Sequence, residues 1–424
     1  MTENSVFNYE GLKVADFTSD QSFEDIVANC PVNIKDEEKE YIKSSYEAGF
    51  YRYCLEYIYK KSMALLRKVL YSAGETIANK MAYVMDQGSI LGISDVFALS
   101  LANKFGIIDR EDRMNIIKLA ELLQAQNRKL NVGQITKEQV ENYGKLCFNY
   151  IFYKDYSAFS ESYKALVDML TNDKLMPLTS EYITILEATN DEKTIVTRLL
   201  FVLLFEVKKK DEVFINNFKL LIPVLWENLS MSDKIFLSLY IKQNNNTELA
   251  EEVLNEVSNH IKIPDFNTDV NLIRHIFVNG QDAIASHFSL NNTRSEISAL
   301  LNIKDNLHIP AMFTRNYICP TILAYIGNPY GYLDEARNVA KEILADISND
   351  KWVYFFKNYF FDAHIMIKLF YSQKTAQAWC DLVKEYIGEI EEEIPNEDVK
   401  NILTMSKAND VDGVRKLCKS LYLK

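Results

Sequence analysis

An apolar residue recurs every three or four positions through almost the whole chain, and this period constrains the fold most strongly. Such spacing gathers apolar side chains on one face of an α-helix. The 424 residues include only 13 Gly and 8 Pro, whereas sheet proteins need many turns rich in these two residues. We therefore predict an all-α fold of helices joined by short polar links. The period is clearest between residues 46 and 70, at Tyr46, Phe50, Tyr53, Cys54, Tyr57, Ile58 and Leu65.

Changes in character along the chain predict its domain organisation. Residues 1–36 are polar and acidic, which predicts an N-terminal arm with one short helix from Ser22 to Asn29. Residues 37–155 carry long helical periods, which predicts a helical bundle. Residues 156–424 alternate helical segments with short links, and such helices pack as antiparallel pairs in a solenoid-like array. The irregular stretch at 290–310 predicts a joint within that array.

Two local signals predict where individual helices begin and end. Thr136 can cap a helix, and Gln139 three residues later can complete a capping box, so a helix is expected to follow Thr136 and end near Tyr153. Around Gly280 the apolar pattern predicts two separate helices, Val270–Val278 and Gln281–Phe288.

Charge and apolar patterning exclude several classes of function. The net charge of −12 repels phosphate backbones, and the best basic run, residues 208–210, is followed at once by Asp211 and Glu212. Nucleic acid is therefore a disfavoured partner. The longest apolar run, residues 195–207, is interrupted by Arg198 and Glu206 and is shorter than the ~20 residues that span a bilayer. We expect no membrane association.

The cysteines and histidines predict no metal or cofactor site. No pair of cysteines forms a CxxC motif, and no histidine lies at metal-ligand spacing from any of them. Thiols scattered among apolar neighbours are typical of buried cysteines in a reducing cytoplasm. The six are Cys30, Cys54, Cys147, Cys319, Cys380 and Cys418.

The segment from Leu119 to Phe152 reads as a helix, a short polar break and a second helix. Asn127, Gly133 and the Ile135-Thr136 opening of the second helix fit the motif region of the HEPN family. The segment therefore resembles the last two helices of that family, a four-helix-bundle fold common in prokaryotic toxins and antiviral systems. The resemblance covers residues 37–155 and implies a bundle of that kind.

The sequence departs from the family where catalysis takes place. Active HEPN proteins are metal-independent ribonucleases that use an Arg and a His. Gln126 stands at the position of the Arg, and Asn131 stands at that of the His. An Asn amide cannot move a proton near neutral pH, and a Gln cannot stabilise a developing phosphorane charge. We therefore expect no catalytic residue at the degenerate motif positions Gln126, Asn127 and Asn131.

The densest aromatic run, from Trp352 to Phe361, is the candidate partner surface. Trp352, Phe356, Tyr359 and Phe360 recur at helical spacing and so share one face. Exposed aromatic clusters often mark interfaces. The alternative is a helix buried on most sides.

These observations favour a non-catalytic helical scaffold or interaction subunit whose partner is another protein; a homo-oligomer is compatible with them. The HEPN resemblance implies a prokaryotic defence or toxin-type complex. One alternative is a ribonuclease or RNA-binding protein of HEPN type that uses Arg128, Lys129 and Tyr143. A second alternative is a repeat-type peptide-binding adaptor, which a concave aromatic groove in residues 156–424 would favour.

Overall fold

The chain forms two compact units of α-helices. The computed structural model describes residues 5–7, 9, 12, 17, 21–31, 33–72, 90–130, 132–206, 211–244, 248–261, 270–290, 293–305 and 310–423. Over these residues the chain is helical with no strand, apart from one isolated bridge between Asn328 and Gly331, so the all-α prediction is confirmed. None of the described helices is long and apolar enough to cross a lipid bilayer.

The units do not follow the predicted domain boundaries. Unit 1 comprises Met1–Asp109 and Lys137–Val270, and unit 2 comprises Arg110–Thr136 and Asn271–Lys424. The two helices on either side of the predicted polar break therefore belong to different units. The predicted division at residues 155 and 156 falls inside unit 1.

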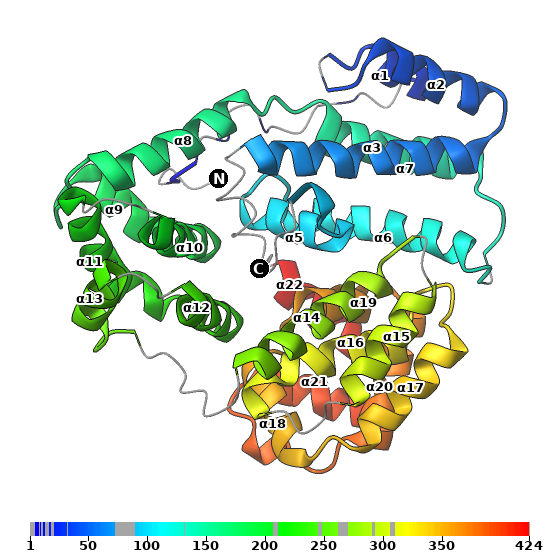
Figure 1. Ribbon diagram of the computed structural model, residues 1–424. Helices are drawn as coiled ribbons and strands as arrows, with labels where there is room; N and C mark the ends of the chain where they lie inside the picture. The colour runs from blue at the N-terminus through cyan, green and yellow to red at the C-terminus, as the bar shows by residue number, and fades with distance from the viewer. Residues whose placement is uncertain are drawn as a thin grey trace. The chain divides into compact units, whose positions relative to one another are not determined.

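Unit 1 combines a helical group around α3 with a two-layered series of helices (Figure 1). In the first part α3 lies against α2, α5 and α7. In the second part α8, α11 and α13 form one layer, whereas α10 contacts α9, α11 and α12. Its elements are α1 (Phe23–Ala28), α2 (Asp36–Glu47), α3 (Tyr51–Ser72), η2 (Ile90–Gly92), α5 (Asp95–Lys104), α7 (Lys137–Cys147), the π-helical turn η3 (Phe148–Phe152), α8 (Ser157–Asn172), α9 (Ser180–Glu187), α10 (Asn190–Glu206), α11 (Glu212–Glu227), α12 (Met231–Asn244) and α13 (Glu248–Val257).

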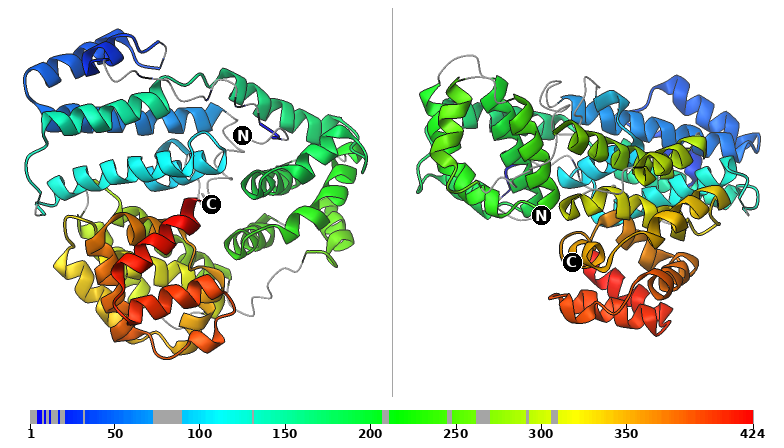
Figure 2. Two further views of the ribbon diagram at one scale, coloured as in Figure 1. Left: turned by 180° about the vertical axis from the view of Figure 1, so that it is seen from behind. Right: turned by 60° about the horizontal axis from the view of Figure 1, so that its bottom comes forward.

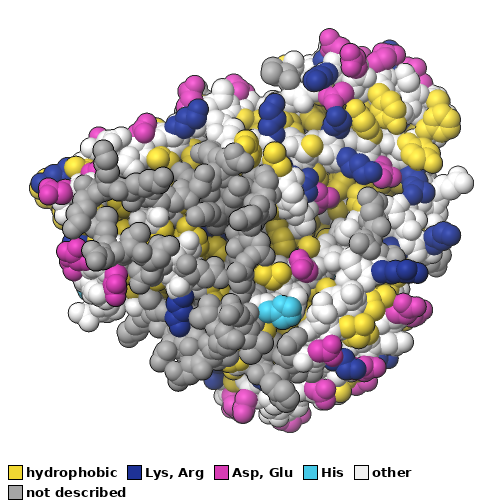
Figure 3. Space-filling model, viewed as in Figure 1, with side chains coloured by type: hydrophobic (Ala, Val, Ile, Leu, Met, Phe, Trp, Pro, Cys, Tyr) yellow, Lys and Arg dark blue, Asp and Glu magenta, His cyan; other side chains and the backbone are white. Residues whose placement is uncertain are grey.

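Of the N-terminal helices of unit 1, α1 forms as predicted, whereas the apolar period from residue 46 to 70 is divided between α2 and α3. Helix α1 forms where it was predicted, and the Ser22 hydroxyl caps it by accepting a hydrogen bond from the Asp25 amide at 3.1 Å. The period from 46 to 70 does not belong to one helix, because Gly49 adopts φ 76° between α2 and α3. Phe50 and Tyr53 are consequently 59% and 62% exposed, and Figure 3 shows hydrophobic side chains gathered at this end of α2 and α3.

Unit 2 packs around α16. All but one of the residues of α16 are buried, so this helix has no polar face and is surrounded by its neighbours. Helices α15, α17, α18, α19 and α20 contact it, and α22 packs on α19, α20 and α21; the two red C-terminal helices lie side by side in Figure 2. The elements are α6 (Arg110–Asn127), α14 (Val270–His287), α15 (Thr293–Lys304), η4 (Ala311–Phe313), α16 (Thr314–Ile326), α17 (Asp334–Ala345), α18 (Asn349–Asn358), α19 (Ala363–Tyr371), α20 (Gln373–Tyr386), η5 (Glu391–Glu393), α21 (Glu397–Lys407) and α22 (Val411–Leu423).

Two stretches that were expected to interrupt helices are helical. Helix α14 runs through Gly280 without a break, and α15 occupies most of the stretch 290–310 that was expected to be a joint. The glycine has a packing role instead. A Cβ at Gly280 would lie 2.2 Å from the Asn316 carbonyl oxygen of α16. Pro320 has no N–H to donate to that carbonyl four residues earlier, so the pair Gly280 and Pro320 allows the two backbones to meet there.

Candidate functional site

The N-terminal segment, defined here as Ser5, Val6, Phe7, Tyr9 and Leu12, provides the clearest candidate site in unit 1. Phe7 is only 3% exposed. Its ring centroid lies 5.6 Å from that of Phe105, 5.4 Å from that of Phe159 and 6.1 Å from that of Tyr163, which is stacked on it. These three rings, which we call the aromatic pocket, come from the end of α5 and from α8. A segment that bends at Val6 and Phe7 therefore inserts an aromatic anchor between helices.

A buried carboxylate fixes the same segment on its polar side. Glu192 lies in the first turn of α10 and is 2% exposed. Its Oε2 accepts hydrogen bonds from the amide and hydroxyl of Thr189, both at 3.0 Å, and completes a capping box. Its Oε1 accepts from the hydroxyls of Ser5 and Tyr9, the latter at 3.2 Å. One carboxylate thus closes a helix end and clamps the segment on both sides of Phe7.

The backbone of unit 1 leaves room for the Tyr9 ring at one glycine. Gly106 has φ 68°, and a Cβ built on it would lie 2.8 Å from the Tyr9 ring. Burial and the neighbouring Glu192 carboxylate raise the pKa of Tyr9, so its hydroxyl stays protonated and remains a hydrogen-bond donor. The segment groove, meaning the aromatic pocket with Gly106 and Glu192, therefore matches the segment in shape and in hydrogen bonding.

Gly106→Ala should loosen the N-terminal segment. We expect it to lower the free energy of unfolding by about 2–4 kcal/mol, from left-handed backbone strain together with overpacking against Tyr9. Gly49→Ala is the matched control, because Gly49 also has positive φ but nothing within 4 Å of its would-be Cβ. Chemical denaturation should show the larger loss for Gly106→Ala. Equal losses would mean that Tyr9 does not pack on Gly106.

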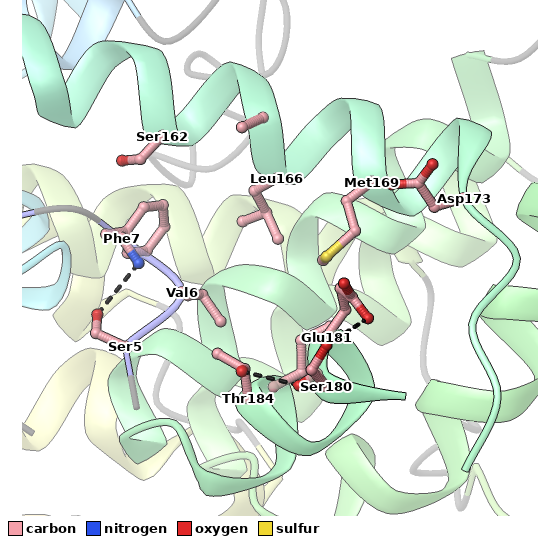
Figure 4. Close-up of a pocket in the computed structure, with 12 residues that line it drawn as sticks. Ser5, Val6, Phe7, Ser162, Leu166, Met169, Asp173, Ser180, Glu181 and Thr184 are labelled. Atoms are coloured by element: carbon pink, nitrogen blue, oxygen red, sulfur yellow. Dashed lines mark hydrogen bonds between the residues drawn. The ribbon is translucent and has the colours of Figure 1, made fainter. Parts of the chain in front are cut away.

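A cavity of about 570 Å³ lies beside the segment, between α8 and α9 (Figure 4). Leu166 and Met169 point into it from α8, and Ser180, Glu181 and Thr184 face them from α9. Ser5, Val6 and Phe7 form the remaining wall. The groove that holds the segment therefore continues into space next to it.

Two of the three positions that the HEPN resemblance singled out, Gln126 and Asn127, form structural hydrogen bonds in unit 2. Gln126 donates a hydrogen bond to the Gly133 carbonyl, and Asn127 donates to the Leu290 carbonyl at 2.8 Å. Asn131 lies outside the described residues. The side chain of Arg128 is buried and pairs with Glu296 at 2.7 Å, so its charge is neutralised inside the protein.

The residues of the ribonuclease alternative are not brought together within either unit. Arg128 and Lys129 belong to unit 2, whereas Tyr143 lies on α7 in unit 1. Lys129 is exposed and has φ 52°, at the end of α6. The Leu130 amide bonds the Ala125 carbonyl at 3.0 Å, and the Lys129 amide bonds that of Gln126 at 3.3 Å. These are the hydrogen bonds of a Schellman helix end, so the polar break is a structural terminus.

Unit 2 contains a buried ionic network that sequence spacing could not reveal. Lys368 of α19 pairs with Glu121 of α6, and both side chains are 1% exposed. His287 bonds Glu296 through Nδ1 at 2.6 Å, and Glu296 also accepts from Arg128. Further pairs join Asp362 to Arg315 at 2.7 Å and to His364 at 2.9 Å.

The network holds its groups in defined protonation states. Burial lowers the pKa of His287 to about 4, so the ring is neutral near pH 7. Burial alone would raise the pKa of Glu296, but His287 and Arg128 hold it at about 2. Apart from Arg315, whose side chain is 21% exposed, these side chains are buried, which makes the network part of the core of unit 2.

The aromatic face expected to be a partner surface is buried. Trp352, Phe356, Tyr359 and Phe360 are 0%, 2%, 6% and 1% exposed. Phe356 and Phe360 pack on Trp379 of α20 with ring centroids 6.4 and 5.7 Å apart. The interpretation as a surface is therefore replaced by that of a core, because α18 and the residues after it sit inside unit 2. Phe361, at 47% exposed, is the outward-facing ring of the run.

The cysteine thiols are buried, and the described residues do not form a metal site. All six cysteines are free and buried, as predicted. Among the described residues, no three His, Cys, Asp or Glu side chains are arranged to hold a metal ion. Comparisons of the chain with protein-family models, curated proteins and solved structures find no match.

Proposed function

We propose that this protein is a non-catalytic interaction subunit, and that the segment groove of unit 1 binds an extended segment of a partner protein. One observation carries the proposal: the N-terminal segment lies in that groove with Phe7 buried in the aromatic pocket. This combines the preferred interpretation of the sequence with the peptide-binding alternative, for which an aromatic groove within residues 156–424 was the expected feature. Phe159 and Tyr163 lie in that range, whereas Phe105 precedes it.

The seated segment defines the chemistry of a ligand. Phe7 supplies an aromatic anchor, and burying a side chain of this size contributes about 1.5–3 kcal/mol. Ser5 and Tyr9, two residues to either side, supply hydroxyl donors for Glu192. A partner segment that repeats this pattern can replace the N-terminal segment without leaving the buried carboxylate unpaired.

The ribonuclease alternative has less support. The Arg128 guanidinium is paired with Glu296, and the net charge of −12 opposes binding to RNA. The HEPN resemblance carries a separate proposal, that the partner belongs to a prokaryotic defence or toxin-type assembly.

The test is binding of the segment in trans. A fluorescent peptide with the sequence of residues 5–12 is titrated against the full-length protein and its Phe7→Ser and Tyr9→Ser variants, and fluorescence anisotropy is recorded. We expect saturable binding to each variant that is at least about tenfold tighter than to the unaltered chain, whose own segment competes.

The control is the same peptide with Ser in place of its Phe, which should bind at least about tenfold more weakly because it lacks the anchor. Circular dichroism of each variant verifies that the helices are retained. A helical variant that fails to bind the unaltered peptide contradicts the proposed function.

A further inference from the structure

We propose that the partner segment carries a lysine or arginine side chain that enters the cavity between α8 and α9. This inference rests on the proposed function and adds the charge of the ligand to it. The cavity has an apolar floor and an acidic rim. A lysine or arginine side chain matches both, because its methylene stem can contact the floor while its charged end group lies at the rim.

The floor of the cavity is apolar. Leu166 and Met169 extend from α8 toward α9 (Figure 4). Ile185 of α9 also lines the cavity. The volume of about 570 Å³ is larger than a lysine or arginine stem, so the cavity has room for one. Long cationic side chains commonly bury their methylene stems on apolar surface and keep the charged group in water.

The rim of the cavity is negative. Asp173, at the end of α8, and Glu181, in the first turn of α9, are the charged residues among its described lining, which includes no lysine or arginine. Both are exposed, and neither forms an ion pair with another side chain in the described part of the chain. Glu181 accepts one hydrogen bond from the hydroxyl of Ser180 at 3.0 Å. Two unpaired carboxylates at the mouth of one cavity favour a cation over a neutral or acidic group.

The N-terminal segment does not supply this cation. Residues 1–12 contain no lysine or arginine, and their charged residues are Glu3 and Glu10. Its described residues therefore provide the aromatic anchor and the hydroxyl donors, and they bring no cationic side chain to the acidic rim. A partner that also provides a cation gains an interaction that the internal segment lacks, which allows it to displace that segment.

The experiment compares four peptides on the full-length Phe7→Ser variant. Each has the sequence of residues 5–12 preceded by Gly and by one test residue, which is arginine, lysine, norleucine or glutamate. We expect the arginine and lysine peptides to bind about 1.5- to fivefold tighter than the norleucine peptide, the range that exposed ion pairs give, and the glutamate peptide to bind most weakly. Added salt should reduce these differences.

A double variant separates the rim from general charge. Asp173→Asn with Glu181→Gln, in the Phe7→Ser background, should abolish the preference for arginine and lysine. Asp168→Asn is the control, because Asp168 is an exposed carboxylate of α8 that does not line the cavity. This control should retain the preference.

The outcomes distinguish the two proposals. Equal affinity for all four peptides would overturn the inference about the cation and leave the proposed function standing. A preference that survives in the double variant would also overturn it, because the rim would not be its source. Absence of binding by every peptide would overturn both proposals together.

Discussion

Lys368→Met should lower the free energy of unfolding by about 3–5 kcal/mol, the cost of breaking a buried ion pair on one side. The substitution leaves the carboxylate of Glu121 buried on α6 without its cation. It also removes the hydrogen bond that Lys368 donates to the Gly327 carbonyl at 2.9 Å. Burial already raises the pKa of Glu121 and lowers that of Lys368, so both charged forms depend on each other. Denaturant titration followed by circular dichroism measures the loss.

The double variant Glu121→Leu with Lys368→Met is the control for this prediction. An apolar pair of similar volume removes the desolvation cost of both charges, so the double variant should regain most of the stability that Lys368→Met loses. A double variant as unstable as the single one would mean that the pair itself, and not the unpaired carboxylate, determines the effect.

Acid should destabilise unit 2 in two steps. His287 has a folded pKa of about 4, below its ordinary value of 6.5. Between these two pKa values the imidazole of His287 is protonated in the unfolded chain but not in the folded chain. The free energy of unfolding therefore falls as the pH decreases from about 6.5 to 4. Glu296 has a folded pKa of about 2, below its ordinary 4.5, so its contribution is lost as the pH decreases from about 4.5 to 2. Together the two groups should account for a loss of several kcal/mol.

His287→Gln tests the first step. Gln can still donate a hydrogen bond to Glu296 but does not titrate, so the unfolding midpoint of the variant should change less between pH 6.5 and 4 than that of the unaltered chain. The decline below pH 4.5 should remain, because Glu296 keeps Arg128 as a partner. An identical pH profile for the two proteins would show that His287 is not the group that couples folding to pH in this range.

Helix content and several helix ends could be predicted from the sequence, because they depend on local spacing. The apolar period and the caps act over three or four residues, so α1 forms after Ser22, and α7 begins at Lys137, directly after the predicted cap Thr136. At Gly280 the same local signals predicted a helix break that is not present, because α14 continues through this residue. A glycine reads as a break from sequence, whereas here it allows α14 to approach the Asn316 carbonyl.

The candidate site could not be predicted because its parts are distant in the chain. Phe7 meets Phe159 and Tyr163, and Ser5 meets Glu192, which is 187 residues away. No spacing rule covers such pairs. One signal was available: Thr189 followed three residues later by Glu192 is a capping-box pattern at the start of α10. That pattern predicts the role of Glu192 Oε2 but not that of Oε1, which accepts hydrogen bonds from Ser5 and Tyr9.

The aromatic run from Trp352 to Phe361 shows that residue spacing does not predict whether a helix face is buried. The expected helix continues only to Asn358, where α18 ends, so Phe360 lies in the turn that follows it. The Phe356 ring nevertheless packs against both Trp352 and Phe360. Spacing identifies a common face but does not say whether that face meets solvent or another helix. Here α20 covers it, with Trp379 against Phe356 and Phe360.

If the segment groove of unit 1 binds a segment of a partner protein, a bound peptide can be located there directly. A peptide of residues 5–12 with benzoylphenylalanine in place of Phe7 is photocrosslinked to the full-length Phe7→Ser variant, and the product is digested and mapped by mass spectrometry. We expect crosslinks to α8 and to the end of α5, around Phe159, Tyr163 and Phe105, that an excess of the unlabelled peptide suppresses. Crosslinks that map to unit 2, or that the unlabelled peptide does not suppress, would contradict the proposed function.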